Sequence, residues 1–213
     1  MSRRLILVRH GQTSWNAIGR AQGHADVHLD SVGHDQASAV APYLATLQPA
    51  ALWSSDLTRA RETCAYVEKA SGLCAIYDAR LREFDVGDRQ GLTMAEFAAQ
   101  FPSEHESWVR GDAQVPVRGA ETLEEVRARI EPALRAYVNE LSTGQTGIAV
   151  THGAALRVGL AALLSWPADV ASGLRVVGNC AWVTVEQEEA TGRVRLAGYN
   201  QSVRPGQETP PPR

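Results

Sequence analysis

An apolar run, Leu-Ile-Leu-Val at residues 5–8, is the sequence feature that most restricts the fold. Four consecutive apolar residues are typical of a strand that is buried on both faces, as in parallel sheets covered by helices on either side. The run ends abruptly at Arg9 and His10. Open α/β sheets bind ligands beyond the carboxyl ends of their strands. This segment therefore predicts a central strand that leads directly into a binding site.

Predicted strands and helices alternate along the rest of the chain. Short apolar runs predict further strands at 50–53, 73–77 and 147–150, and a terminal hairpin is predicted from 180–186 and 194–199. Apolar residues at helical spacing predict helices at 31–47, 58–71, 94–101, 104–109, 121–141 and 154–164. The alternation predicts an α/β fold with a mostly parallel central sheet.

The length of 213 residues suits one domain, which we expect over residues 1–203. Residues 204–213 are rich in proline and predict a disordered tail. A net charge of −3 argues against nucleic acid or an anionic membrane as the main partner. The sequence leaves open whether the chain forms a homodimer.

The three cysteines are odd in number and form no C-x-x-C pair. This pattern argues against a disulfide framework or a zinc ribbon and predicts a reduced, cytoplasmic protein. The apolar run at 5–8 is too short for the core of a signal peptide, and no apolar stretch reaches the length of a membrane span.

Each predicted parallel strand leads into a polar segment, and these segments are expected to meet at one edge of the sheet. They are Arg9-His10-Gly11-Gln12-Thr13-Ser14-Trp15-Asn16, Ser54-Ser55-Asp56-Leu57-Thr58-Arg59-Ala60-Arg61, Asp78-Ala79-Arg80-Leu81-Arg82-Glu83 and Thr151-His152-Gly153-Ala154. Arginine forks bind phosphoryl oxygens, a histidine can attack phosphorus and a carboxylic acid can protonate a leaving oxygen. The set therefore predicts a site for a dianionic phosphoryl group.

The same segments resemble the ordered motifs of the histidine phosphatase superfamily, the phosphoglycerate-mutase-like proteins. The matching residues are Arg9-His10-Gly11-Gln12-Thr13-x-x-Asn16, Gln22-Gly23, Leu29-Asp30-x-x-Gly33-x-x-Gln36-Ala37, Ser54-Ser55-Asp56-Leu57-x-Arg59-Ala60-x-x-Thr63, Leu81-Arg82-Glu83-x-x-x-Gly87-x-x-x-Gly91 and Thr151-His152-Gly153. The resemblance runs from about residue 5 to at least residue 183. It implies the phosphoglycerate-mutase-like fold, a three-layer α/β/α arrangement with a mostly parallel central sheet.

The resemblance also implies roles for individual residues. His10 is similar to the nucleophile that becomes phosphohistidine, and Glu83 to the general acid. The implied phosphate pocket comprises Arg9, Arg59 and His152, with substrate-binding contacts from Asn16, Gln22, Gly23 and the Gly153 N–H. Members of the family need no metal, so neither a metal nor a cofactor is expected. Two segments depart from the family pattern, Val86-Gly87-Asp88-Arg89-Gln90-Gly91 and Gly119-Ala120-Glu121-Thr122.

Some of these assignments have rivals within the sequence. Arg61 competes with Arg59 but points to another helix face, and we expect it to be solvated. Asp85 and Asp88 compete with Glu83, whose assignment comes mostly from the resemblance. A metal site could be drawn from His24, Asp26, His28, Asp30 and His34. Loop polarity and helix capping by Asp30 explain that set better. Trp15 is a candidate for a wall of the pocket.

The chemistry places demands on His10 and Glu83. Two nearby arginines should lower the pKa of His10 and keep a ring nitrogen free to attack. The other ring nitrogen should be held as N–H by a backbone carbonyl near Gly11. Glu83 must protonate the leaving alcohol and then accept a proton from water. A glutamate among arginines would normally ionise, so some burial is needed to keep Glu83 protonated.

The predicted function is hydrolysis of small phosphorylated metabolites by a metal-independent phosphomonoesterase. A cofactor-dependent phosphoglycerate mutase is the alternative, but the stretch between Glu83 and His152 is short and contains no lysine. A non-catalytic phospholigand-binding module is disfavoured because the expected catalytic residues are present. The segment Gly178-Asn179-Cys180-Ala181-Trp182 and the overall layout resemble the glucosyl-3-phosphoglycerate phosphatases of actinobacteria; a ribazole-phosphate phosphatase also remains open.

Overall fold

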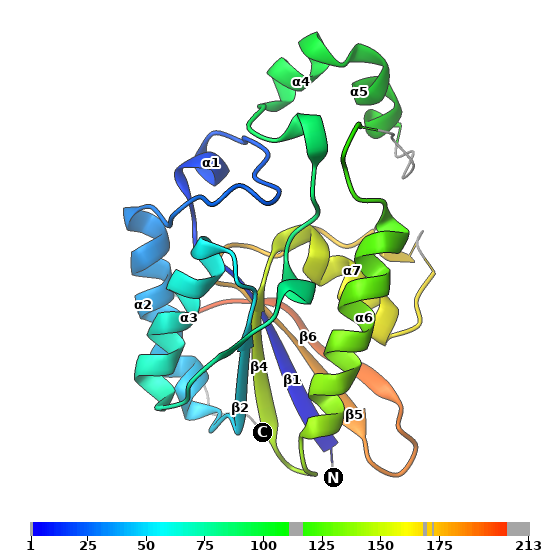
Figure 1. The fold of residues 1–213 in the computed structure, drawn as a ribbon. Coiled ribbons are helices and arrows are strands. Elements are labelled where there is room, and N and C mark those ends of the chain that lie inside the picture. Colours follow the sequence, from blue (N-terminus) through cyan, green and yellow to red (C-terminus); the bar gives the residue numbers. More distant parts are fainter. Residues whose placement is uncertain (1, 111–116, 168–169, 172, 204–213) are drawn as a thin grey trace.

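A single six-stranded sheet forms the centre of the computed structural model, which describes residues 2–110, 117–167, 170–171 and 173–203 (Figure 1). The strand order is β3-β2-β4-β1-β5-β6. The strands are β1 (Ser2–Arg9), β2 (Ala51–Ser54), β3 (Ile76–Tyr77), β4 (Thr146–Thr151), β5 (Trp182–Glu188) and β6 (Val194–Gln201). β1, β2, β3 and β4 pair in parallel, whereas β5 and β6 are antiparallel. The predicted mostly parallel sheet is thus confirmed.

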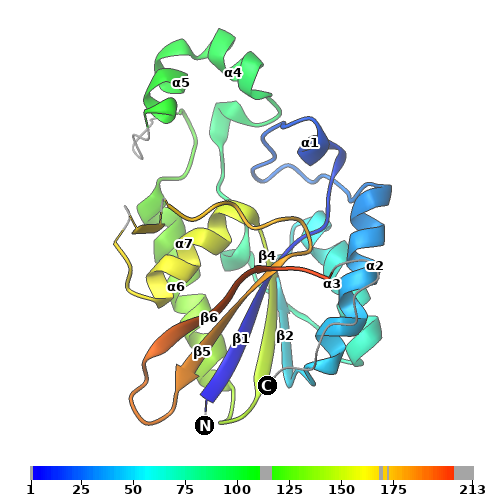
Figure 2. The ribbon, with the colours of Figure 1, turned by 180° about the vertical axis from the view of Figure 1, so that it is seen from behind.

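Helices cover both faces of this sheet (Figures 1 and 2). One face carries α2 (Ser31–Thr46) and α3 (Thr58–Ser71), and the other carries α6 (Leu123–Glu140) and α7 (Gly153–Leu163). The predicted three-layer α/β/α arrangement is therefore confirmed. The prediction for residues 204–213 lies outside the described part of the chain.

The apolar run in β1 supplies both halves of the core. Successive strand side chains point to opposite faces of a sheet. Leu5 and Leu7 accordingly pack with the buried residues of α6 and α7, whereas Ile6 and Val8 pack with those of α2 and α3. All four side chains are at most 1% exposed. Burial on both faces fixes β1 in the centre of the sheet, so the position of its carboxyl end is fixed as well.

A small helical cap stands beyond the carboxyl ends of β1, β2 and β4 (Figure 1). We use "cap" for the helical segments η2 (Gly87–Arg89), α4 (Met94–Gln100) and α5 (Pro102–Val109). The cap begins and ends at a narrow neck, where Val86 and Ala120 form an isolated antiparallel bridge. Gly87 lies so close to the returning chain that a Cβ there would be 2.1 Å from the Arg118 carbonyl oxygen. Glycine is therefore required where the two sides of the neck cross.

Most predicted elements shift by one or two residues at their ends; for example, α5 begins at Pro102 instead of 104 and β5 at Trp182 instead of 180. Two predicted boundaries have a clear physical reason for their correction, and one helix is missing from the prediction. The strand predicted at 73–77 is reduced to β3, because the Ala75 N–H donates to the side chain of Glu68 on α3. The helix predicted from 121 begins at Leu123, since Thr122 is its N-cap and accepts a hydrogen bond from the Glu125 N–H. The short α1 (Ser14–Ala17) was not predicted. It is capped by Thr13, whose side chain accepts from the Asn16 N–H.

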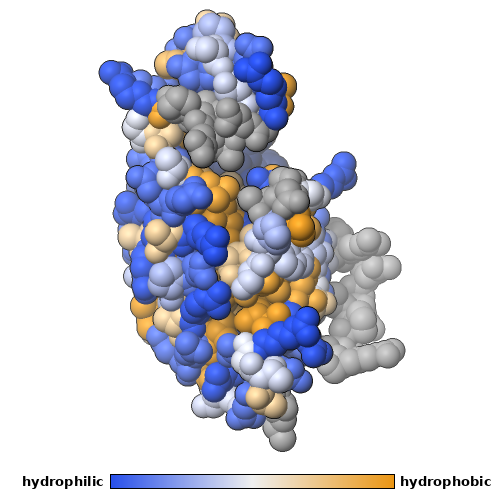
Figure 3. Space-filling view, turned by 90° about the vertical axis from the view of Figure 1, so that its right-hand side faces the viewer, coloured by the Kyte–Doolittle hydropathy of each residue, from blue (hydrophilic) through white to orange (hydrophobic). Residues whose placement is uncertain are grey.

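The face formed by α6, α7 and the β5–β6 hairpin shows apolar surface between hydrophilic side chains (Figure 3). Leu164, Val194 and Leu196 are half-buried residues that pack against the core on this side. Among the described residues, no helix is both long and apolar enough to cross a membrane.

Candidate active site

Three neighbouring strand ends bring His10, Ser55 and His152 together. β4 lies between β1 and β2, and these residues follow β1, β2 and β4 directly. The His10 N–H donates to the Thr151 carbonyl at 3.0 Å, and the Ser55 N–H donates to the Val150 carbonyl at 2.9 Å. The hydrogen-bond pattern between the parallel strands thus continues to the first residue after β1 and β2. It places the rings of His10 and His152 with their centroids 5.1 Å apart.

His10 is buried, with 2% of its surface exposed, and its ring is oriented by two contacts. Nδ1 lies 2.7 Å from the Gly11 carbonyl oxygen, so Nδ1 carries the proton and donates it. Nε2 accepts a hydrogen bond from the Arg59 Nε–H at 3.3 Å. The predicted backbone contact at Gly11 is confirmed. Nε2 is therefore the nitrogen whose lone pair is available for attack.

The pKa of His10 is well below its usual value, as the sequence predicted. The main cause is burial of the ring, and the charges of Arg59 and Arg9 add to it. The prediction had assigned the shift to the arginines alone. Burial disfavours the imidazolium form and keeps His10 neutral.

Arg59 and Arg9 place positive charge in this buried site. Arg59 is 1% exposed and donates to the carbonyls of Ala25 at 2.9 Å and Gly23 at 2.8 Å. Arg9 donates to the Val177 carbonyl at 2.8 Å, and its buried Nε finds no partner within the described residues. In the described part of the chain, every hydrogen bond of these guanidinium groups goes to an uncharged acceptor. Burial lowers the pKa of Arg59 to about 10, so it stays charged at neutral pH.

His152 is fully buried next to these charges. Its Nε2 lies 2.8 Å from the Ser55 hydroxyl oxygen, and its buried Nδ1 has no partner among the residues that the structure describes. Burial, followed by the charge of Arg59, holds the pKa of His152 well below its usual value. An unpaired buried polar atom is costly unless a ligand satisfies it. Sequence reasoning gave Ser55 no role, although the residue lies within the second motif.

The loop that carries His10 is held by close packing and by Thr63. The Thr63 hydroxyl accepts from the Gly11 N–H at 3.0 Å and donates to the Arg59 carbonyl at 2.7 Å. A Cβ on Gly11 would lie 2.6 Å from the Gly33 carbonyl oxygen, and a Cβ on Gly33 would lie 2.0 Å from the Gln12 carbonyl oxygen. Two glycines are therefore needed where the loop crosses the start of α2. Thr63 belongs to the second motif, but the motif does not predict this linking role.

Asn16 is oriented by its neighbours. Its Oδ1 accepts from the Thr13 N–H at 3.1 Å and from Asn179 Nδ2 at 3.3 Å. These contacts fall on the oxygen and leave the amide N–H groups for a ligand. Asn179 also donates to the His10 carbonyl at 3.0 Å, so it links Asn16 to the loop that carries His10. The sequence singled out Asn179 only through a resemblance.

The remaining predicted substrate contacts lie around the same pocket. Gln22 is buried, and no described residue donates to its Oε1. Gly23 contributes the carbonyl that Arg59 binds. Gly153 is the first residue of α7, where backbone N–H groups and the helix dipole favour anions.

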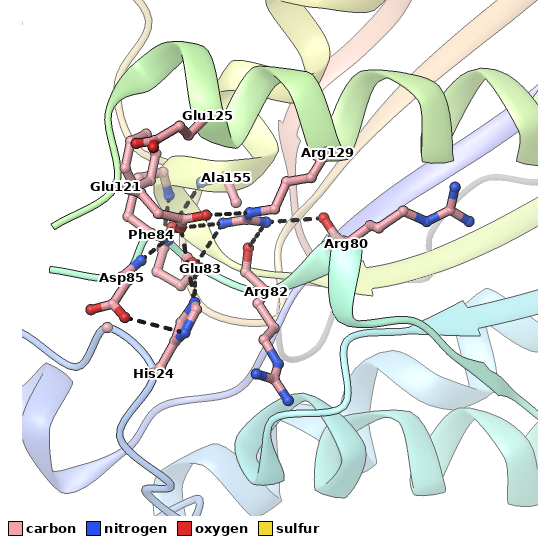
Figure 4. Close-up of polar contacts among 12 residues, drawn as sticks. His24, Arg80, Arg82, Glu83, Phe84, Asp85, Glu121, Glu125, Arg129 and Ala155 are labelled. Carbon is pink, nitrogen blue, oxygen red and sulfur yellow. Dashed lines mark hydrogen bonds and ion pairs between the residues drawn. The ribbon is translucent and has the colours of Figure 1, made fainter. Parts of the chain in front are cut away.

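Glu83 lies at the N-terminus of α7. Its Oε1 accepts from the N–H groups of Ala155 at 2.9 Å and Phe84 at 3.0 Å, and its Oε2 accepts from the Ala154 N–H at 3.0 Å (Figure 4). The Glu83 carboxylate therefore binds the two backbone N–H groups that follow Gly153, next to His152. The Glu83 charge also acts on both Arg9 and Arg59, where it opposes the effect of burial on their pKa values. Glu83 is half-buried, as expected.

The rival residues lie elsewhere. Arg61 is exposed, with its guanidinium carbon 4.0 Å from the centre of the Tyr77 ring. The Asp85 carboxylate accepts from the Gly87 N–H at 2.9 Å, and Asp88 forms an ion pair with Arg118 at 2.8 Å. Trp15 reaches the cap, where its ring would lie 3.5 Å from a Cβ on Gly91.

The five residues considered for a metal site point to separate partners. These contacts are His24 with the Glu83 carbonyl, Asp26 with the Thr58 N–H, His28 with Glu62, Asp30 with the Gly33 N–H and His34 with Tyr66. Asp30 is the N-cap of α2, which confirms its predicted capping role. Within the described ranges, no group of three or more histidine, cysteine or acidic residues is arranged to hold a metal ion.

The fold and the arrangement of these motifs define a protein class. The family model of the histidine phosphatase superfamily (branch 1) matches residues 5–200. The chain therefore belongs to this superfamily, as its motifs predicted.

Proteins of similar sequence and structure include phosphatases and probable mutases. Glucosyl-3-phosphoglycerate phosphatase of Mycolicibacterium vanbaalenii is 39% identical over 191 residues, which is 85% of this chain and 83% of the relative. Probable phosphoglycerate mutase GpmB of Citrobacter koseri is 35% identical and covers 87% of this chain and 86% of its own. A solved structure of mycobacterial glucosyl-3-phosphoglycerate phosphatase with VO3 has a TM-score of 0.86 at 36% identity, covering 94% of this chain and all of that one. The chain is an enzyme that hydrolyses phosphate esters.

Proposed function

We propose that this enzyme hydrolyses small phosphorylated metabolites through a phosphohistidine at His10, without a metal ion. The observation that carries the proposal is the pair of buried guanidinium groups of Arg9 and Arg59, whose described hydrogen bonds go to uncharged acceptors. Buried positive charge is costly unless it is paired. The charges of Glu83 and Asp26 act on these arginines without direct pairing, since no carboxylate in the described part of the chain accepts a hydrogen bond from them. A phosphoryl dianion beside His10 supplies a direct partner and can accept a hydrogen bond from Nδ1 of His152, which has none among the described residues.

In the first step, Nε2 of His10 attacks phosphorus and the bond to the leaving oxygen breaks. The guanidinium groups of Arg9 and Arg59 neutralise the charge on the equatorial oxygens, and Asn16 and the Gly153 N–H donate further hydrogen bonds. Glu83 is a carboxylate in the free site and takes up a proton from solvent when the phosphate dianion binds. The protonated carboxyl group then gives this proton to the leaving oxygen, which departs as an alcohol.

In the second step, water attacks the phosphohistidine. Glu83, now a carboxylate, takes a proton from that water as the N–P bond breaks. Inorganic phosphate leaves and His10 returns to its neutral form. One carboxyl group thus serves as acid and then as base, and the positive charge that a metal would supply comes from arginine.

For the substrate, we propose a phosphorylated glycerate derivative such as glucosyl-3-phosphoglycerate. The support is the name shared by several relatives at 36–39% identity and by solved structures that match 94% of this chain. Release of phosphate should be measured over a panel that includes this ester, simple sugar phosphates and α-ribazole phosphate. A preference for another ester of at least tenfold in kcat/KM would reject the substrate while leaving the reaction type intact.

The phosphohistidine is tested by labelling. The enzyme is mixed with substrate carrying a labelled phosphoryl group, quenched in alkali within one turnover and digested. We expect the label on the peptide that contains His10, and no label on a His10→Ala variant. His34→Ala is the matched control, since His34 lies on α2 and contacts Tyr66. Label retained by His10→Ala would show that another group is the nucleophile.

Two further predictions accompany this function. We propose a cytoplasmic enzyme, because a reduced compartment suits three unpaired cysteines, Cys64, Cys74 and Cys180. A homodimer stays a prediction, for which light scattering after size-exclusion chromatography is the direct measurement.

A further inference from the structure

Arg129 on α6 binds the backbone of the segment that carries Glu83. Its Nη1 donates to the carbonyls of Arg80 at 3.0 Å and Arg82 at 2.7 Å, and its Nη2 donates to the Glu83 carbonyl at 2.8 Å (Figure 4). One side chain therefore reaches three carbonyls within four residues. These carbonyls face α6, whereas the Glu83 carboxylate faces α7.

Glu121 holds Arg129 in this position. Its two oxygens accept from Nε of Arg129 at 2.8 Å and from Nη2 at 2.7 Å, which is the bidentate geometry of a strong arginine–carboxylate pair. Glu121 also accepts from the Asp85 N–H at 2.8 Å. The Arg129–Glu121 pair consequently binds the backbone before Glu83, at the Arg80 and Arg82 carbonyls, and after Phe84, at the Asp85 N–H. Only 18% of the Arg129 side chain and 22% of the Glu121 side chain is exposed.

His24 binds the same carbonyl from the opposite side. Its Nε2 lies 2.8 Å from the Glu83 carbonyl oxygen. His24 follows Gly23, whose carbonyl accepts from Arg59. The Glu83 carbonyl thus receives one donor from α6 and one from the loop that contacts the phosphate-binding arginine. Its position is fixed relative to both.

From these contacts we infer that Arg129, oriented by Glu121, is the positioning residue for the general acid. The inference rests on the proposed acid role of Glu83. With its carbonyl fixed, Glu83 has only its own side-chain torsions with which to move. Lysine cannot replace Arg129, because a single ammonium lacks the planar fork that reaches three carbonyls and a carboxylate together.

A purely structural role for Arg129 makes a different prediction. Loss of fold stability would slow the reaction of every substrate alike. A misplaced acid slows only those substrates whose leaving group needs a proton. An alkyl alcohol leaves poorly as an alkoxide, whereas 4-nitrophenolate leaves readily without protonation. Dependence on the leaving group therefore separates the two roles.

The experiment compares single-turnover phosphorylation of His10 by an alkyl phosphate and by 4-nitrophenyl phosphate. Glu83→Gln is measured first, and we expect the alkyl substrate to slow by about 10²–10⁴-fold and the aryl substrate by much less. Arg129→Lys should then slow the alkyl substrate by about 10²-fold, since small misplacements of a catalytic group have effects of that size. Its aryl rate should stay within about twofold.

Controls keep the outcome interpretable. Arg127→Lys is the matched control on α6, because Arg127 is exposed and pairs with Glu131 at 3.0 Å; it should change neither rate. If Arg129→Lys fails to fold, Glu121→Gln is measured in its place. This variant keeps the shape of the side chain at 121 and removes the negative charge that holds Arg129. It should show the same dependence on the leaving group. In the Glu83→Gln background, Arg129→Lys should add no further selective loss.

Each result decides a separate question. If Glu83→Gln slows both substrates equally, Glu83 is not the acid and the proposed function is revised. If Glu83→Gln is selective but Arg129→Lys slows both substrates equally, the acid assignment stands and the positioning role of Arg129 is wrong. Additive selective losses in the double variant would likewise overturn the positioning role.

Discussion

The Nε–H of Arg59 donates to Nε2 of His10 across 3.3 Å, so the proposed phosphate-binding group occupies the lone pair of the proposed nucleophile. This contact orients the ring and is lost when Nε2 attacks phosphorus. A phosphoryl oxygen that takes over the Arg59 donor frees Nε2 in the same movement. Binding of the phosphoryl group and release of the nucleophile are thereby linked.

Inorganic phosphate should stabilise the enzyme through this contact. A ligand present at a hundred times its Kd adds about 2.7 kcal/mol to the free energy of unfolding, which corresponds to a rise in Tm of several degrees. Arg59→Met should abolish the rise, measured by scanning calorimetry with and without phosphate. Arg61→Met is the control and should retain it, since Arg61 is exposed. An unchanged rise in Arg59→Met would place phosphate elsewhere.

The low pKa of His10 predicts how the phosphorylation rate depends on pH below neutrality. An unperturbed imidazole with pKa near 6.5 would be only about one quarter neutral at pH 6. Burial of His10 lowers its pKa well below that value, so phosphorylation by 4-nitrophenyl phosphate should be nearly constant from pH 7.5 to 6. A fourfold fall over this range would contradict a buried, neutral nucleophile.

The same shift affects stability in a defined direction. The folded pKa of His10 lies below the unfolded one, so the unfolded chain binds more protons in acid. The stabilisation linked to neutral His10 is therefore complete above about pH 6.5 and is lost as the pH falls below it. His10→Ala should flatten the dependence of Tm on pH between about 7 and 5 relative to the unmodified enzyme.

Removal of metal should leave the activity unchanged. Arg9 and Arg59 already supply positive charge beside His10, and the candidate metal ligands near His24 contact separate partners. Phosphate release from 4-nitrophenyl phosphate is measured after dialysis against EDTA. A loss of rate that zinc or magnesium restores would overturn the metal-free mechanism.

Hydrolysis should exceed isomerisation of 3-phosphoglycerate. A mutase must retain its bisphosphate intermediate, and the stretch between Glu83 and His152 contains no lysine to help hold a second anionic group. With 2,3-bisphosphoglycerate supplied, 2-phosphoglycerate should form more slowly than phosphate is released from the best substrate. Efficient isomerisation would instead place the enzyme with the relatives named as probable mutases.

The sequence predicted the parts of the site that depend on local order. Arg9 and His10 follow a buried strand, and the Nδ1 contact at Gly11 involves the adjacent residue, so both could be read from the chain. Arg59 was distinguished from Arg61 by helix position alone. These features depend on spacing within one element, which the sequence displays directly.

Contacts between distant elements could not be predicted in this way. Ser55 and His152 are 97 residues apart, and they meet because β2 and β4 pair in a register that a sequence alone does not reveal. The anchoring of Glu83 by α7 and by Arg129 likewise depends on how two helices pack over one loop. Burial, the main cause of the His10 pKa shift, is also a property of the assembled core.

The bridge between Val86 and Ala120 separates the cap from the rest of the chain. The cap helices lie between these two residues in the sequence, and His10, Arg59, Glu83 and His152 all lie outside that interval. The proposed phosphotransfer residues and the cap are therefore encoded by separate stretches of the gene, so the sequence of either can change while the other is inherited unaltered.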